Sequence, residues 1–131
     1  MKKYKTGITF GAFDPIHFGH IELFIRAKNL CEKLIVCVST NAYIEGKKGR
    51  KERFSYRKRA RSVAAVRCVD IVGNQSPYFS KKQAVKKYKA DVIFVGSDWN
   101  PKTFTGEGLG IPVVYLPRTK GISSSELVKN I

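Results

Sequence analysis

The spacing of apolar residues predicts strands that alternate with helices along the whole chain. Three of the apolar stretches, 34–39, 91–96 and 111–116, are nearly continuous, as expected for strands covered on both faces. The five predicted strands are residues 6–11, 34–39, 68–72, 91–96 and 111–116. Alternation with helical segments along the chain predicts an α/β fold, a doubly wound parallel five-stranded sheet with helices on both faces. We expect one domain spanning residues 1–131.

The predicted helices rest on amphipathic spacing and on serines placed where helices begin. In the first helix, Phe24 and Cys31 fall on one apolar face. Ser55 and Ser80 each precede a helical segment and are suitable caps. The helices are predicted over residues 20–33, 55–66, 80–89 and 123–131. Two glycines and many basic residues in 45–52 predict a mobile loop there.

Composition narrows the class of protein. The chain has 131 residues, of which 43% are hydrophobic, which suits a globular fold with its own core. No apolar run has the length of a membrane-spanning helix, and the start of the chain lacks the pattern of a leader peptide. Cys31, Cys37 and Cys68 are scattered and lie in apolar contexts, which predicts buried thiols in a reducing compartment. We therefore expect a cytoplasmic protein with no membrane insertion.

The net charge requires an anionic partner. Lysine and arginine number 25 against 10 acidic residues, giving a formal charge of +15. Phosphate-bearing small molecules and nucleic acid both fit this charge. The basic stretch 46–62, with interleaved aromatic residues, favours a nucleic-acid-binding module as one alternative. That alternative does not explain the two histidines described next.

The stretch TFGAFDPIHFGH has the composition of an anion site at a helix start. Gly11 ends the first predicted strand, and the next helix begins near Phe18. Free amides and the positive end of the helix dipole attract an anion there. Gly19 lacks a side chain where backbone approaches a ligand, and His17 and His20 can both offer imidazole donors. The arrangement predicts a polyphosphate site.

The segment GAFDPIHFGH resembles the signature of the nucleotidyltransferase superfamily with the HxGH motif. Members join a nucleoside triphosphate to a phosphorylated small molecule and release pyrophosphate. The segment RTKGISSSEL resembles the C-terminal segment of the superfamily. YLPRTKGIS, VGSDW and VRCVD are similar to elements of glycerol-3-phosphate cytidylyltransferases, in the same order. The resemblance covers essentially the whole chain and implies a Rossmann-like fold.

The resemblance implies four catalytic residues. His17 and His20 would stabilise charge on the α-phosphate and the leaving oxygens, and Arg118 would bind the β- or γ-phosphate. Lys47 would bridge acceptor and nucleotide. The loop is one residue longer than in the subgroup, so Lys48 is the alternative to Lys47.

The resemblance also implies binding residues. Asp98 would contact ribose or base, and Ala12 replaces a threonine of the subgroup, so a hydroxyl contact is lost there. The implied nucleotide-binding residues are Gly11, Ala12, Phe13, Gly19, Lys48, Asp98, Thr119, Gly121, Ile122, Ser123 and Ser124. The implied acceptor-binding residues are Asp14, Arg59 and Lys81. For Asp14 the alternative is a capped turn before Pro15, and for Arg59 and Lys81 it is a solvated charged surface.

The implied reaction transfers CMP from CTP to a small phosphorylated polyol, foremost glycerol 3-phosphate, giving CDP-glycerol and pyrophosphate. Ribitol phosphate, phosphoethanolamine and other three-carbon phosphates remain open, as does an adenylyltransferase that uses ATP. Mg²⁺ is expected mainly on the nucleotide phosphates, with no dedicated protein ligands. The resemblance further implies a homodimer that supplies an activated polyol for a cell-surface polymer. Nucleic acid is not an expected partner.

Overall fold

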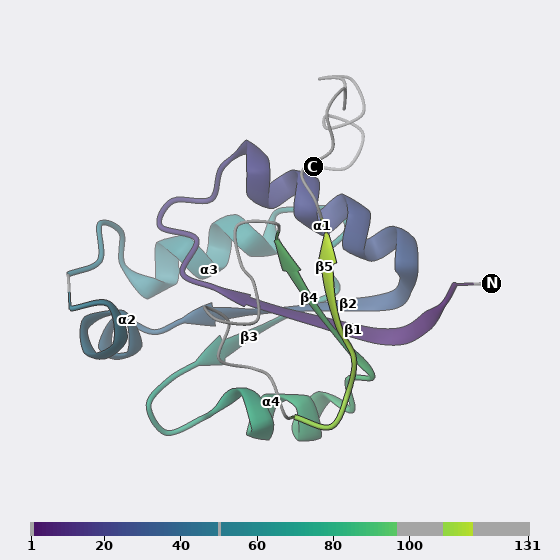
Figure 1. Ribbon diagram of the computed structural model, residues 1–131. Coiled ribbons are helices and arrows are strands. Elements are labelled where there is room, and N and C mark those ends of the chain that lie inside the picture. Colours follow the sequence, from purple (N-terminus) through teal and green to yellow (C-terminus); the bar gives the residue numbers. More distant parts are fainter. Residues whose placement is uncertain (1, 50, 97–108, 117–131) are drawn as a thin grey trace.

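The computed structural model describes residues 2–49, 51–96 and 109–116, which form a parallel sheet flanked by helices (Figure 1). The strands are β1 (Tyr4–Gly11), β2 (Cys31–Ser39), β3 (Ile71–Gln75), β4 (Val92–Gly96) and β5 (Val113–Leu116). The helices are α1 (Phe18–Leu30), α2 (Asn41–Lys48), α3 (Tyr56–Ala64) and α4 (Lys81–Tyr88). Strand and helix alternate as predicted from β1 to β4, except that α2, which was not predicted, precedes α3 between β2 and β3.

The sheet has the order β3-β2-β1-β4-β5, and every neighbouring pair of strands is parallel. The chain runs outward from β1 to β3 and then returns to the other side of β1 for β4 and β5. The order therefore reverses between β1 and β4, and ligands of such sheets bind beyond the carboxyl ends of the strands at that point. The predicted doubly wound α/β fold is confirmed.

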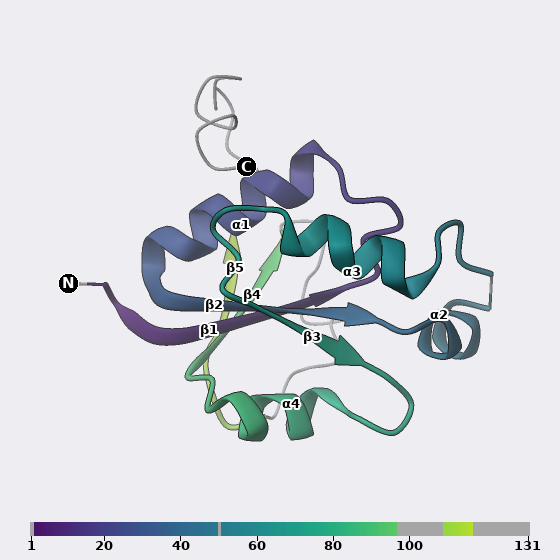
Figure 2. The same cartoon turned by 180° about the vertical axis from the view of Figure 1, so that it is seen from behind.

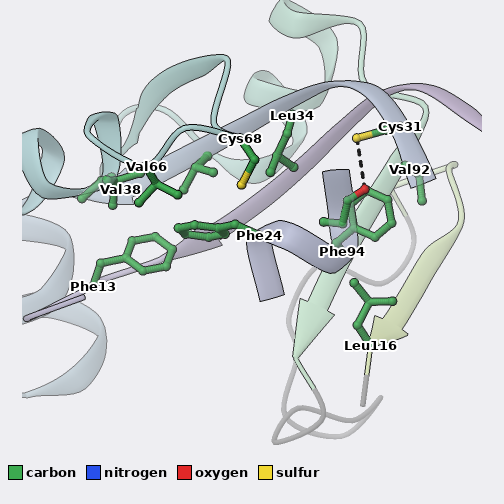
Figure 3. Packing of buried hydrophobic residues seen from close by; sticks show 13 residues of the cluster. Phe13, Phe24, Cys31, Leu34, Val38, Val66, Cys68, Val92, Phe94 and Leu116 are labelled. Atoms are coloured by element: carbon green, nitrogen blue, oxygen red, sulfur yellow. Dashed lines mark hydrogen bonds between the residues drawn. The ribbon is translucent and has the colours of Figure 1, made fainter. Parts of the chain in front are cut away.

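Helices cover both faces of the sheet, with α1 and α3 on one face and α4 on the other (Figures 1 and 2). On the first face, Phe24 of α1 and Val63 of α3 are fully buried against the strands, in the cluster drawn in Figure 3. On the second face, Ala84 of α4 packs against Ile8 and Ile35. These apolar faces explain why the strands read as continuous apolar runs. Helix α2 lies beyond the end of β2 (Figure 2).

Helix α1 passes directly into β2, which shortens the predicted first helix. Cys31 was expected on the helix but is the first residue of β2, with extended backbone. Its thiol donates a hydrogen bond of 3.4 Å to the Ala27 carbonyl (Figure 3). The Cys31 thiol packs against the last turn of α1, so an apolar residue at this position is consistent with both a helix and a strand. The prediction that Cys31 belongs to the helix was wrong for this reason.

The third strand begins three residues later than predicted, at Ile71 instead of residue 68. Asp70 explains the shift, because its carboxylate accepts from the Leu34 amide at 2.7 Å and its own amide donates to the Leu34 carbonyl. Its carboxylate also pairs with Lys28. These bonds hold residue 70 beside Leu34 of β2, and the register between β2 and β3 begins with the next pair, Ile35 and Ile71.

The predicted mobile loop at 45–52 is wrong in its first half, because residues 45–48 belong to α2. Thr40 caps this helix by accepting from the Tyr43 amide at 3.2 Å. Gly49 ends it in the left-handed conformation with φ of 61°. The predicted caps at Ser55 and Ser80 are confirmed.

The three cysteines are buried free thiols, as predicted. Burial raises the pKa of Cys37 to about 12 and that of Cys68 to about 11. Within the described ranges, no helix combines the length and the apolar character needed to cross a membrane.

Candidate active site

The histidine pair lies where α1 begins, directly after the loop that follows β1. The Nδ1 atom of His17 accepts a hydrogen bond of 3.0 Å from the Gly19 amide. The Nδ1 atom of His20 accepts one of 3.1 Å from the His17 amide. The two rings stack with centroids 3.7 Å apart. Each imidazole therefore satisfies one of the backbone donors that a helix start leaves open.

These hydrogen bonds fix which nitrogen carries the proton. A nitrogen that accepts a hydrogen bond holds a lone pair, so Nδ1 is unprotonated in both rings. The proton of each neutral imidazole is then on Nε2. The neutral forms of His17 and His20 thus carry their N–H donor on Nε2, the nitrogen that takes no part in these capping bonds.

Three predicted nucleotide-binding residues, Gly11, Phe13 and Gly19, pack around the histidine pair. A Cβ at Gly19 would lie 3.0 Å from Cε1 of His17, so glycine makes room for the capping ring. Phe13, with φ of 52°, is buried and packs edge-on against His20 at a centroid distance of 4.9 Å. At Gly11, a Cβ would lie 2.8 Å from the Phe13 ring. The loop between β1 and α1 therefore holds the His20 ring in place through its contact with Phe13.

Asp14 joins this loop to the segment before α3. Its carboxylate accepts from the amides of Arg53 and Phe54, both at 2.7 Å. The predicted turn-capping alternative does not describe these bonds, because the partners are 39 and 40 residues away. Acceptor binding by Asp14 stays a prediction.

Arg59 is buried, with 1% of its surface exposed, and joins the same segments. Its NH1 nitrogen donates to the carbonyls of Ala12 and Ser39 at 2.9 and 2.6 Å. NH2 donates to Asn41 Oδ1 at 2.7 Å, and Nε donates to the Phe54 carbonyl at 2.8 Å. The solvated-surface alternative for Arg59 is therefore wrong. Acceptor binding stays a prediction, and the contacts described favour a role in joining the loops that carry the site.

A cleft of about 500 Å³ lies between α2 and the segment from β3 to α4. Lys47 and Lys81 both line it, so two predicted site residues meet there. The Lys81 ammonium is half-buried and lies 5.5 Å from the centre of the Phe10 ring and 5.8 Å from that of Tyr43. Burial, and then the nearby charge of Lys47, lower the pKa of Lys81. An anion in this cleft would relieve the repulsion between the two ammonium groups.

The remaining predicted site residues divide into two groups. Lys48 is the last residue of α2. The others lie outside the described residues, and they are Asp98, Arg118, Thr119, Gly121, Ile122, Ser123 and Ser124. Convergence of the histidine pair with Arg118 therefore stays a prediction. Among the described residues, no group of three or more His, Cys, Asp or Glu could hold a metal ion.

Sequence reasoning missed Tyr43 and Gln75, which also line the cleft. Tyr43 escaped because no helix was predicted over residues 41–48, and Gln75 escaped because the third strand was predicted to end at residue 72. Once Thr40 is recognised as a cap, Tyr43 and Lys47 stand four residues apart on one face of α2. That spacing is the signal that could have found Tyr43.

Comparison with known proteins identifies a family model and two similar relatives. A family model described as cytidylyltransferase-like matches residues 8–130. A glycerol-3-phosphate cytidylyltransferase of Bacillus subtilis (strain 168) is 39% identical over 127 residues, which cover 97% of each chain. One of Staphylococcus aureus (strain NCTC 8325 / PS 47) is 34% identical, covering 97% of this chain and 95% of the relative.

The crystal structure of a lipopolysaccharide core biosynthesis protein from Thermoplasma volcanium GSS1 superimposes with a TM-score of 0.72. It is 22% identical and covers 88% of this chain and 97% of its own. This likeness supports the fold.

Proposed function

Because the chain belongs to the cytidylyltransferase-like family, we propose that it transfers CMP from CTP to glycerol 3-phosphate, giving CDP-glycerol and pyrophosphate. The observation that carries the choice of a phosphorylated acceptor is the meeting of Lys47 and Lys81 in one cleft. This cleft opens at the carboxyl ends of the strands, as does the loop that carries the histidine pair. In this proposal, the cleft with Lys47 and Lys81 binds the acceptor phosphate, and the loop with the histidine pair binds the phosphates of CTP.

In the proposed reaction, a phosphate oxygen of the acceptor attacks the α-phosphorus of CTP. The new P–O bond forms as the bond from the α-phosphorus to the bridging oxygen breaks, and pyrophosphate leaves with that electron pair. The attacking phosphate is already an oxyanion, so the reaction needs positioning and charge neutralisation instead of a base. This fits a site composed of imidazole and ammonium donors.

Each residue has a proposed task in this scheme. The Nε2–H groups of His17 and His20 donate to oxygens on which charge grows, and the start of α1 adds its dipole. Lys81 holds the acceptor phosphate, and Lys47 lies between acceptor and nucleotide. Arg118 binds the β- or γ-phosphate, as proposed from the resemblance. Further nucleotide contacts are proposed for Asp98, Thr119, Gly121, Ile122, Ser123 and Ser124.

We propose that Mg²⁺ binds mainly through the phosphates of CTP. The described donors agree with this, because imidazolyl N–H and ammonium groups bind phosphate oxygens rather than Mg²⁺. When bound, the ion neutralises part of the triphosphate charge. Because the proposed substrate is CTP, we also propose that the chain works in the cytoplasm. We further propose that it forms a homodimer, which sedimentation velocity would test.

The test measures pyrophosphate release with CTP or ATP against glycerol 3-phosphate, ribitol 5-phosphate and phosphoethanolamine. We expect the highest kcat/KM for CTP with glycerol 3-phosphate. Faster release with ATP would favour an adenylyltransferase, and no release with any pair would contradict transfer altogether. Retention on RNA that CTP does not compete away would support the nucleic-acid-binding alternative instead.

A further inference from the structure

The hydroxyl of Tyr43 has two hydrogen-bond partners, and it accepts from both. Nε2 of Gln75 lies 3.1 Å from the phenolic oxygen, and Nζ of Lys81 lies 3.3 Å from it. An amide nitrogen and an ammonium group can only donate, because neither has a lone pair to offer. The phenolic proton is therefore used by neither partner.

The surroundings keep this proton in place. Gln75 is 4% exposed, and its Oε1 lies 3.4 Å from the Ser39 hydroxyl, which also contacts the Gly11 carbonyl at 3.2 Å. Burial raises the pKa of Tyr43, so the phenol stays protonated at neutral pH. Since both lone pairs are directed at Gln75 and Lys81, the O–H bond points away from both of them.

Tyr43 lines the cleft that Lys47 and Lys81 also line. We propose that the Tyr43 hydroxyl binds the acceptor by donating a hydrogen bond to an oxygen of its phosphate group, beside Lys81. The proposal rests on the proposed function, since it names a contact of that acceptor. It assigns a specificity contact to a neutral side chain in a cleft that two lysines also line.

A phosphate fits this trio better than an uncharged hydroxyl. Two donors only 3.3 Å apart, the phenol and the Lys81 ammonium, can both reach oxygens of one phosphate group. The neighbouring charge of Lys47 adds a preference for an anion. A phenol also donates along a fixed direction, whereas an ammonium acts as a point charge. The three groups together select a phosphate monoester.

The experiment compares the wild-type chain with Tyr43→Phe, which keeps the ring and removes only the hydroxyl. Tyr78→Phe is the matched control, because Tyr78 is 90% exposed. In Tyr43→Phe we expect the KM for glycerol 3-phosphate to rise about tenfold, the size of one hydrogen bond to a charged group. The kcat and the KM for CTP should change less than about twofold, and Tyr78→Phe should match the wild type. An unchanged acceptor KM in folded Tyr43→Phe overturns the proposal.

A double variant separates direct contact from positioning of Lys81. If the hydroxyl only placed the ammonium, Tyr43→Phe would have no further effect once Lys81→Met had removed it. We expect instead a further rise of several-fold in acceptor KM when Tyr43→Phe is added to Lys81→Met. Identical KM values for Lys81→Met and the double variant would contradict direct contact.

Calorimetric titration with glycerol 3-phosphate alone keeps the two proposals distinguishable. Loss of the proposed function appears as a wild-type chain that transfers no CMP, whatever the titrations show. The Tyr43 contact is supported if glycerol 3-phosphate binds about tenfold more weakly to Tyr43→Phe than to the wild type. It is overturned if the two dissociation constants are equal, or if neither chain binds this compound.

Discussion

Arg59 lies 47 residues from Ala12 in the sequence, yet its guanidinium donates a hydrogen bond of 2.9 Å to the Ala12 carbonyl. The same group reaches Ser39 at the end of β2 and Asn41 at the start of α2. The histidine loop and the helix that carries Lys47 thus share one buried anchor. The carbonyls of Ala12 and Ser39 are both acceptors, so they cannot bond to each other. The Arg59 guanidinium supplies the donor that joins them.

Replacing Arg59 with alanine is expected to lower the free energy of unfolding by about 3 kcal/mol or more. Two buried carbonyls, of Ala12 and Ser39, would lose their donor, and each unsatisfied group costs about 1–3 kcal/mol. Chemical denaturation measures the change. The control is Arg57→Ala in the same helix, where an exposed side chain should change stability by less than about 0.5 kcal/mol. Equal stabilities for the two variants would contradict the anchor.

His17 has a structural and a chemical task that substitution can separate. His17→Ala removes the helix cap and should cost about 1 kcal/mol of stability. His17→Asn keeps a capping side chain and should retain stability. Both variants lose the Nε2–H donor, so both should lose about a hundredfold in kcat. Urea unfolding and initial rates report the two effects, and wild-type turnover in His17→Asn would exclude the proposed chemical task.

Lys47 and Lys48 compete for one role, and paired alanine variants distinguish them. Since Lys47 lines the cleft with Lys81, Lys47→Ala should lower kcat by about a hundredfold. Lys48→Ala should lower kcat by less than about tenfold, as for a contact that mainly attracts substrate. Steady-state kinetics with CTP and glycerol 3-phosphate gives both values. A larger loss for Lys48→Ala would transfer the role to that residue.

The lowered pKa of Lys81 predicts how acceptor binding depends on pH. Binding a phosphate needs the charged ammonium, which a lysine loses as pH rises through its pKa. Because burial and Lys47 lower that pKa, acceptor affinity should start to fall at a lower alkaline pH than for an ordinary lysine. Lys47→Met removes the repulsion and should move the fall to higher pH. Titrations with glycerol 3-phosphate across the alkaline range measure this, and an unmoved profile would contradict it.

The sheet was predictable because continuous apolar runs that are separated by helical segments indicate buried strands of a parallel sheet. Its details were not, because they depend on contacts between distant residues. Asp70 looks like part of a strand in VRCVD, but it lies directly before β3 and is bound to Leu34. Helix α2 was missed because a glycine and basic residues near its end resemble a loop. The hydrogen bond from the Tyr43 amide to the Thr40 side chain stabilises the start of this helix despite the glycine and basic residues near its end.

The candidate site was predictable where a motif carries it and less so elsewhere. The histidines were found from their spacing at a helix start, and the geometry adds the capping bonds that orient them. Arg59 was implied by the resemblance alone, since nothing in the composition of YRKRARS distinguishes it from its neighbours. Its burial follows from three carbonyls that no local pattern reveals.

Helix α1 ends at Leu30 and β2 begins at Cys31, with no residue between them. The length of α1 therefore determines which side chains of β2 point to each face of the sheet. One residue inserted there would rotate α1 by about 100° or exchange the inward and outward residues of β2. Val36 and Ile35, which face opposite layers, would each meet the wrong one. Length variation among related chains should therefore avoid this joint and gather in the segments that follow the carboxyl ends of the strands.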